Sequence, residues 1–322
     1  MRKLIFCLLS SFVIFIANAQ QTKDSLDRIL NETPIELKTQ EGTIYGTLAV
    51  PAMQANKKFP LALIISGSGA TDRNGNNPSM KNESLRLLAH GLAQKGIASV
   101  RYDKRGIAAS LAAGKNEADL RFEHYISDVK DWLKLLRADK RFTSLTVIGH
   151  SEGSLIGMIA ANGLADKYIS LAGFGYPAHM KLKEQMATQP PVIRDSCNKL
   201  LDMLAEGKRS DSISPFIYAL FRPTIQPYLI SWFQYDPRVE LAKLQIPVLI
   251  VQGTTDIQVT VADAQSLEKA NKKAKSMIIT GMNHVLKVAD ADRSKNIATY
   301  YDPKLPLEES LVAGIANFIK SN

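Results

Sequence analysis

The sequence predicts an α/β protein in which helices cover both faces of a mostly parallel sheet. Short apolar runs without alternation, such as residues 61–65 and 145–148, are typical of strands buried on both faces. Helical patterns with one apolar side, such as residues 80–94 and 123–138, separate these runs. Because strand and helix alternate, and such repeats build parallel sheets, we expect this architecture for most of the 322 residues.

Strand patterns occur eight times along the chain. The first two alternate polar and apolar residues around Gln40-Glu41-Gly42, which predicts an antiparallel hairpin. The others lie within strand–helix repeats. The expected strands are residues 35–39, 43–50, 61–65, 97–102, 145–148, 168–174, 248–251 and 275–280. Further helices are expected directly after Gly153, at 261–270 and at 307–319.

Strand patterns are missing between Pro177 and about residue 238, where prolines interrupt helical segments. We interpret this stretch as a helical cap inserted into one core domain. The expected division is core at residues 20–177, cap at 178–240 and core again at 241–322.

Seven aromatic residues fall in the second half of this cap. They are Phe216, Tyr218, Phe221, Tyr228, Trp232, Phe233 and Tyr235. Such a cluster either packs the cap's own small core or forms an apolar wall over a substrate site, and both can hold. The second interpretation assigns Trp232 and Phe233 to substrate binding.

The first 19 residues have the regions of a secretory signal peptide: Arg2 and Lys3, an apolar run at 4–16, and a small-residue cleavage site ending at Ala19. The apolar run is too short for a comfortable membrane span, so no stable membrane anchor is expected. We therefore expect a secreted or periplasmic protein. Cleavage leaves Cys197 as the single cysteine, which excludes an internal disulfide.

The charge pattern does not indicate a nucleic-acid partner. The formal charge of +9 falls to +7 (38 basic minus 31 acidic residues) without Arg2 and Lys3, and the lysines are scattered rather than gathered in a basic stripe. The sequence contains no clustered cysteines, no His-Glu-x-x-His motif and no Walker loop, so we expect no metal and no other cofactor. It does not indicate an oligomeric state.

The segment Gly149-His150-Ser151-Glu152-Gly153 joins an apolar strand to an apolar helix. This pattern predicts a nucleophile elbow, a sharp turn that holds a serine in strained geometry with its hydroxyl exposed above the sheet. Glycine is needed two residues before and after the serine, because the turn leaves no room there for a Cβ atom. An ordinary turn serine is the alternative, but the flanking strand and helix favour the elbow.

Asp256 and His284 each follow a predicted strand. The carboxyl ends of strands in an open α/β sheet meet at one edge, so Ser151, Asp256 and His284 are expected to converge as a catalytic triad. The chain order Ser, Asp, His is that of α/β-hydrolases. Asp236 and Asp263 are alternative candidates for the triad aspartate, although neither directly follows a strand. His150 is expected to point away from the nucleophile into the fold.

The stretch Ser66-Gly67-Ser68-Gly69 follows the third predicted strand. An oxyanion hole needs two N–H donors, and we assign these to the backbone of Ser68 and of Glu152. Gly67 and Gly69 would then contact substrate. A dinucleotide-binding loop is an alternative, but Asp72 stands where that motif requires its third glycine.

These motifs resemble those of the α/β-hydrolase superfamily of serine hydrolases, along the whole mature chain. The segments 66–69, 72–76, Tyr102-Asp103-Lys104-Arg105-Gly106 and the elbow are similar to those of capped bacterial carboxylesterases in the serine aminopeptidase-like branch. Ala108 departs from the pattern, which has glycine there. The resemblance implies hydrolysis of short to medium acyl esters of small molecules, with Asp72, Asp103 and Arg105 bracing loops around the site.

We therefore expect a secreted serine carboxylesterase that forms an acyl-enzyme on Ser151, with His284 moving the proton and Asp256 orienting the imidazole. A serine peptidase or an acyl thioesterase on the same fold remains an alternative. A non-catalytic binding protein on a hydrolase scaffold is an alternative of another class, which a complete triad disfavours.

Overall fold

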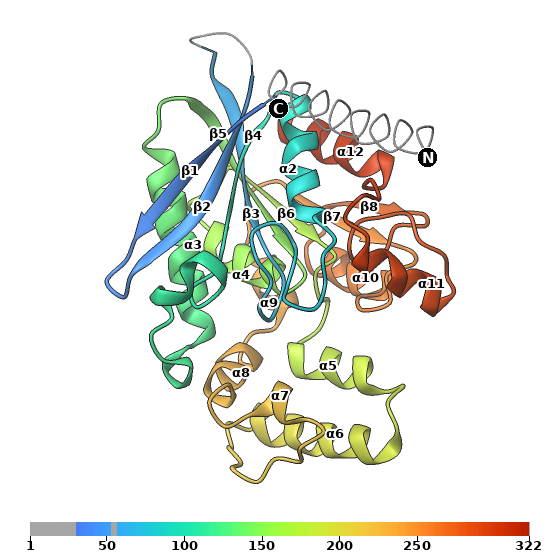
Figure 1. The fold of residues 1–322 in the computed structure, drawn as a ribbon. Coiled ribbons are helices and arrows are strands. Elements are labelled where there is room, and N and C mark those ends of the chain that lie inside the picture. The colour runs from blue at the N-terminus through green and yellow to red at the C-terminus, as the bar shows by residue number, and fades with distance from the viewer. Residues whose placement is uncertain (1–29, 53–56, 322) are drawn as a thin grey trace, which may run out of the picture.

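The computed structural model describes residues 30–52 and 57–321, so the predicted signal peptide lies outside the described residues. The strands of this region form a sheet in the order β1-β2-β4-β3-β5-β6-β7-β8 (Figure 1). Strands β1, β2 and β4 pair antiparallel, and every other neighbouring pair is parallel. The predicted fold class and the hairpin are confirmed.

The strands match the expected runs closely. They are β1 Leu30–Lys38, β2 Thr43–Pro51, β3 Phe59–Ile65, β4 Ala98–Tyr102, β5 Phe142–His150, β6 Lys167–Leu171, β7 Val248–Gly253 and β8 Lys275–Ile279. Along the inner strands the side chains alternate between two buried layers. Leu61 and Leu63 of β3 face one apolar cluster, and Ala62 and Ile64 face the other.

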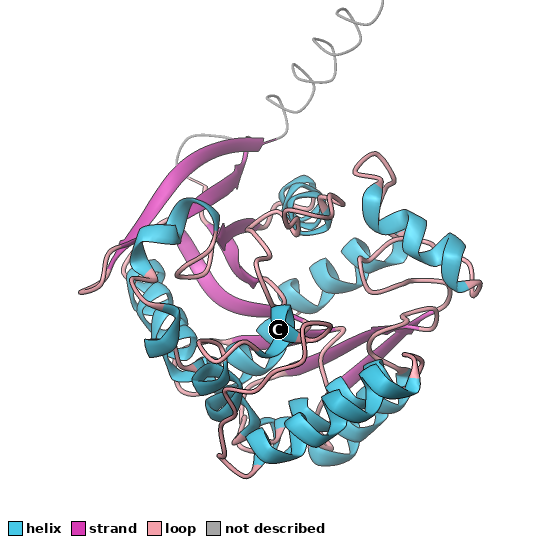
Figure 2. Ribbon diagram, turned by 60° about the horizontal axis from the view of Figure 1, so that its bottom comes forward, coloured by secondary structure: helices cyan, strands magenta, loops and turns pink. Residues whose placement is uncertain are grey.

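Helices cover both faces of the sheet (Figure 2). Helices α2 (Ser84–Gln94) and α12 (Glu309–Lys320) pack on one face. Helices α3 (Phe122–Arg137), α4 (Glu152–Ala161) and α10 (Val261–Ala270) pack on the other. The remaining short elements near the core are η1 Ala108–Ala113, η2 Glu117–Asp119, α11 Arg293–Ala298 and η3 Thr299–Tyr301. None of the helices that the structure describes has the length and apolar character needed to cross a membrane.

Helix α2 begins four residues later than its apolar pattern suggests. Residues 80–83 belong instead to a loop in which both Asn82 and Glu83 donate their N–H groups to the side chain of Asn76. Glu83 also has a left-handed backbone, with φ of 59°, which cannot continue a helix. The loop after β3 is therefore longer than predicted and reaches the amino end of α2.

Helices alone fill the chain between β6 and β7. They are α5 Ala178–Met186, α6 Pro191–Ala205, α7 Tyr218–Phe221, α8 Gln226–Phe233 and α9 Pro237–Ala242. Helices α5 to α8 form a group beyond one end of the sheet (Figure 1), whereas α9 contacts α4 and α10 of the core. The predicted cap boundary at residue 240 falls inside α9, the last helix before β7.

Candidate active site

Ser151 occupies the turn between β5 and α4. Its backbone has φ of 56° and ψ of −123°, a conformation that L-residues rarely adopt. The turn is tight: a Cβ on Gly149 would lie 2.2 Å from the carbonyl oxygen of Gly153, and one on Gly153 would lie 2.5 Å from that of Ile65. The two glycines therefore allow the strained turn, as the sequence predicts.

His284 and Asp256 form a buried pair at the same edge of the sheet. His284 Nδ1 lies 2.8 Å from Asp256 Oδ2, and the other carboxylate oxygen accepts the N–H groups of Gln258 and Val259. Burial alone would raise the pKa of Asp256, but His284 and these two N–H groups hold it below its ordinary value. The ionised carboxylate must accept, so in the neutral imidazole Nδ1 carries the hydrogen and Nε2 keeps its lone pair.

Ser151 and His284 line one pocket of about 190 Å³. Among the described residues, no hydrogen bond joins Ser151 Oγ to His284 Nε2. Such bonds are often long without substrate. The pocket walls come from the loop after β3, including Ser68, Asn77 and Asn82, and from Tyr300 and Gln258. None of the residues lining it in the described structure is Asp, Glu, Lys or Arg, which suits an uncharged ligand.

The loop after β3 lies against the nucleophile. A Cβ on Gly67 would lie 3.1 Å from Ser151 Cβ, so this glycine permits close approach of the loop backbone. Gly69 has a left-handed φ of 68°. In the described hydrogen bonds the Ser68 N–H has no protein acceptor. The predicted donors of Ser68 and Glu152 therefore flank Ser151, one on the loop and one at the amino end of α4.

The sequence predicts that His150 points away from the nucleophile, but the structure places it at the pocket. Its ring is buried but lines the same pocket, with its centroid 4.8 Å from that of His284. His150 Nε2 lies 2.9 Å from the His284 carbonyl oxygen and so donates to it. Burial and then the nearby His284 lower the pKa of His150 to about 3, so the ring is neutral at physiological pH.

Trp232 and Phe233 are not among the residues that line this pocket. Trp232 is stacked between Phe122 and Phe174, with centroid distances of 6.0 and 6.1 Å, and Phe233 packs beside His179. Both side chains are buried. Trp232 thus joins α8 to the core, whereas Phe233 contacts α5 within the inserted helices. The role of both residues in substrate binding stays a prediction.

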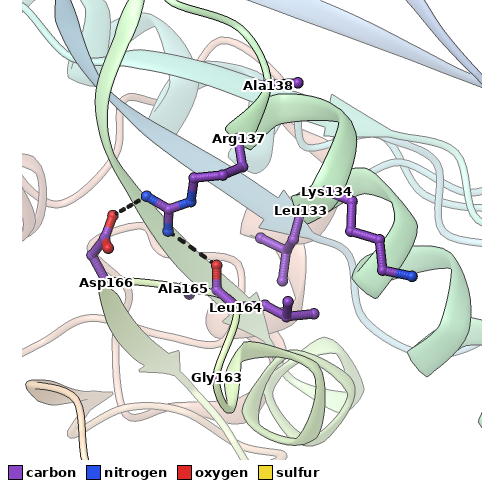
Figure 3. Close-up of a pocket in the computed structure, with 8 residues that line it drawn as sticks. All are labelled: Leu133, Lys134, Arg137, Ala138, Gly163, Leu164, Ala165 and Asp166. Atoms are coloured by element: carbon purple, nitrogen blue, oxygen red, sulfur yellow. Dashed lines mark hydrogen bonds and ion pairs between the residues drawn. The ribbon is translucent and has the colours of Figure 1, made fainter.

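A larger cavity of about 590 Å³ lies elsewhere, between the end of α3 and the turn that precedes β6 (Figure 3). Arg137 crosses it and binds Asp166 and the carbonyl oxygen of Leu164, at 2.8 and 3.0 Å. This hollow opens at the amino end of β6, whereas the catalytic candidates follow the carboxyl ends of their strands. It therefore has no part in the candidate site.

The sequence indicated no role for Lys104, and it indicated Tyr228 only as a member of the aromatic cluster of the cap. The Lys104 ammonium binds the Gly67 carbonyl oxygen at 2.6 Å and Glu152 Oε2 at 2.7 Å, and the Tyr228 hydroxyl donates to Glu152 Oε1. Lys104 follows the carboxyl end of β4, which is the signal that could have singled it out. Within the described residues, no three His, Cys, Asp or Glu side chains gather as a metal site would require.

The strand order, with a strained serine between a central strand and its helix, is that of the α/β-hydrolase fold. A family model described as "Serine aminopeptidase, S33" matches residues 82–209. Esterase EstD of Thermotoga maritima is 26% identical over 280 residues, which are 85% of this chain. The chain spans 65% of the length of this curated relative.

Solved structures of esterases share the fold. Est1E from Butyrivibrio proteoclasticus superimposes with a TM-score of 0.58 at 18% identity, covering 89% of this chain and 99% of its own. The Pyrococcus furiosus esterase Pf2001 gives a TM-score of 0.56 at 15% identity and covers 92% of this chain and 94% of its own. The chain is thus similar to esterases along most of its length.

Proposed function

We propose that this protein is a serine carboxylesterase that hydrolyses short to medium acyl esters through an acyl-enzyme on Ser151. The observation that carries the proposal is the strained Ser151 in one pocket with the buried His284–Asp256 pair. The similarity of this chain to the esterases EstD, Est1E and Pf2001 supports it.

In the proposed reaction, Ser151 Oγ attacks the ester carbonyl carbon while His284 Nε2 takes the hydroxyl proton. The N–H groups of Ser68 and Glu152 stabilise the oxyanion. Collapse of the tetrahedral intermediate breaks the bond to the alcohol, which leaves with the proton from His284. Water, activated by the same imidazole, then attacks the acyl-enzyme and releases the carboxylic acid. Asp256 holds the imidazole in the required tautomer throughout.

We predict that Ser151→Ala and His284→Ala each keep the fold and reduce ester hydrolysis about 10⁴-fold or more, since triad residues act as a unit. The measurement is kcat/KM on p-nitrophenyl butyrate, with circular dichroism as the check on folding. A fluorophosphonate probe should label the wild type stoichiometrically and Ser151→Ala not at all. Wild-type turnover in Ser151→Ala would remove this serine from the mechanism.

A serine aminopeptidase is the second candidate, supported by the description of the matching family model. An aminopeptidase must bind the α-ammonium group of its substrate, and a carboxylate is the usual partner for such a cation. The pocket that contains Ser151 has no acidic residue in its described lining, which favours a neutral ester. A comparison of kcat/KM on esters, thioesters and aminoacyl p-nitroanilides would decide between them.

We also propose that the protein is exported, to the periplasm or beyond, after cleavage behind Ala19. The charged start, apolar run and small-residue site support this. Mass spectrometry of the protein from its native host should find a mature chain that begins at Gln20. An intact chain beginning at Met1 would contradict export by this route.

A further inference from the structure

A buried ion pair lies directly behind the proposed oxyanion hole. Lys104 Nζ is 2.7 Å from Glu152 Oε2, and each side chain is only 1% exposed. The same ammonium donates to the carbonyl oxygen of Gly67 at 2.6 Å. Removing a lysine and a glutamate from water is costly, and replacing such a pair by apolar residues is often stabilising. The pair is therefore poorly explained by stability alone.

The carbonyl bound by Lys104 belongs to the peptide unit that carries the Ser68 N–H. A peptide unit is planar, with its C=O and N–H on opposite sides, so fixing the carbonyl oxygen also fixes the direction of the N–H. A cation on the oxygen also draws electron density away from the nitrogen, which makes the N–H a stronger donor. Lys104 thus orients and polarises the Ser68 N–H from behind.

Glu152 is the residue directly after Ser151, and its buried carboxylate shares the Lys104 ammonium with the Gly67 carbonyl oxygen. Alone, this negative charge would oppose the negative charge of the developing oxyanion, because charges interact strongly where water is excluded. Lys104 compensates it. The remaining carboxylate oxygen accepts the hydroxyl of Tyr228, which comes from α8. One network therefore runs from α8 through Glu152 and Lys104 to the Gly67–Ser68 peptide.

We propose that Lys104 is a positioning residue for the oxyanion hole: it holds the Gly67–Ser68 peptide in its donating orientation and neutralises Glu152. Glu152 and Tyr228 hold Lys104 in place, so the position of α8 is coupled to the hole. This inference rests on the proposed function, since it concerns the Ser68 N–H during acyl transfer.

The test compares Lys104→Met with Lys167→Met. Lys167 is also buried and donates to backbone carbonyls, those of Phe318 and Ile319. It begins β6, however, and so lies at the amino ends of the parallel strands, away from the candidate site. For Lys104→Met we expect kcat on p-nitrophenyl butyrate to fall about 10²-fold, within the range for loss of an oxyanion-hole donor, with KM changed less than about three-fold. Lys167→Met should lose stability but keep its kcat.

A transition-state analogue separates positioning from general damage. A trifluoromethyl ketone forms a hemiketal on serine whose oxygen occupies the oxyanion hole. Its inhibition constant should therefore rise in Lys104→Met by the same factor as kcat/KM falls. The double variant Lys104→Met/Glu152→Gln removes both buried charges and should fold more stably than the single one, while its ketone affinity stays low.

Tyr228→Phe tests the connection to α8. It should lower kcat several-fold in the wild type and have almost no effect in a Glu152→Gln background, because the tyrosine acts through the carboxylate. The proposal is overturned if Lys104→Met keeps the kcat of Lys167→Met, or if ketone affinity and kcat/KM change independently. An absence of hydrolysis and of fluorophosphonate labelling in the wild type would instead contradict the proposed esterase function.

Discussion

At the scale of single residues, the site depends on one strained backbone conformation. A non-glycine residue at positive φ costs on the order of 1 kcal/mol, and it persists only where its surroundings enforce it. Here the Ser151 N–H donates to the Leu171 carbonyl at 3.0 Å, and the helix that starts at Glu152 fixes the far side of the turn. Strand β6 and helix α4 therefore hold the serine in place before any substrate binds.

We predict that Gly149→Ala prevents this turn from forming. Its Cβ would meet the Gly153 carbonyl oxygen at 2.2 Å, and backbone atoms cannot move aside without opening the elbow. The soluble fraction of the Gly149→Ala variant should lose both ester hydrolysis and fluorophosphonate labelling. Gly163→Ala is the matched control, because Gly163 has φ of 75° but no atom within 4 Å of the added Cβ.

Gly163→Ala should lower the free energy of unfolding, measured in urea, by about 1 kcal/mol and leave kcat unchanged. Full activity in Gly149→Ala would mean that the turn can relax around a methyl group. That result would also remove the steric reason for glycine on both sides of the serine.

The sequence could identify residues whose position follows from the chain alone. Ser151, Asp256 and His284 each lie directly after a strand, and the sheet brings strand ends together. The contacts of His150, Lys104 and Tyr228 depend instead on side-chain direction and on how α8 packs. No spacing in the sequence encodes side-chain direction or helix packing. The position of His150 at the pocket and the network behind the oxyanion hole could therefore not be predicted.

At the scale of secondary-structure elements, α8 is the main connection between the inserted helices and the core. It supplies Tyr228 to Glu152, and it supplies Trp232 to a stack with Phe122 of α3 and Phe174 after β6. The sequence predicted an aromatic cluster here, but it could not distinguish packing within the cap's own small core from an apolar wall over the substrate site. Both outcomes use the same apolar residues, so composition cannot distinguish them.

We predict that Trp232→Ala destabilises the protein by about 3–5 kcal/mol, because it removes a buried aromatic side chain between two others. The measurement is the free energy of unfolding in urea. The same variant and Phe233→Ala should be assayed on p-nitrophenyl esters from acetate to palmitate. If these rings also shape the acyl site, the preferred chain length should increase in both variants.

An unchanged chain-length profile in both variants would restrict the two aromatic residues to packing. Val239→Ala on α9 is a suitable control, since Val239 is 54% exposed. Its effect on unfolding should stay within about 0.5 kcal/mol, as is usual for surface positions.

At the scale of the whole molecule, the buried neutral His150 makes stability depend on pH. The pKa of an unfolded histidine is about 6.5, whereas that of folded His150 is about 3. Between these values the unfolded chain binds a proton that the native state does not. The contribution of neutral His150 to the free energy of unfolding is therefore complete above pH 6.5 and is lost as the pH falls toward 3.

We predict that His150→Gln reduces the loss of stability on acidification. The glutamine amide can still donate to the His284 carbonyl but does not titrate, so the slope between pH 6 and 4 should fall by up to about 1.4 kcal/mol per pH unit. Urea denaturation at several pH values gives this slope. Above pH 7.5 the difference in free energy of unfolding between the wild type and His150→Gln should be constant. Equal slopes in acid would contradict a buried, uncharged His150.

The sequence could predict the fold class, but not every boundary of a helix or strand. Alternating strands and helices predict a parallel sheet, and Gln40-Glu41-Gly42 predicts the hairpin, both of which the structure contains. The start of α2 was not predictable, because the Asn76 side chain competes for the N–H groups that would have begun the helix. Local polar bonds of this kind override an apolar pattern.

In the part of the chain that the structure describes, β1 and β8 form the two margins of the sheet, and each is a place where another chain could add a strand. Strand β1 exposes Glu36 and Lys38 there and contains Pro34, which has no N–H to offer. Strand β8 has only five residues and begins with the exposed Lys275. Charge, proline and shortness all discourage strand addition. An eight-stranded sheet is thus protected at both margins from the intermolecular pairing that leads to aggregation.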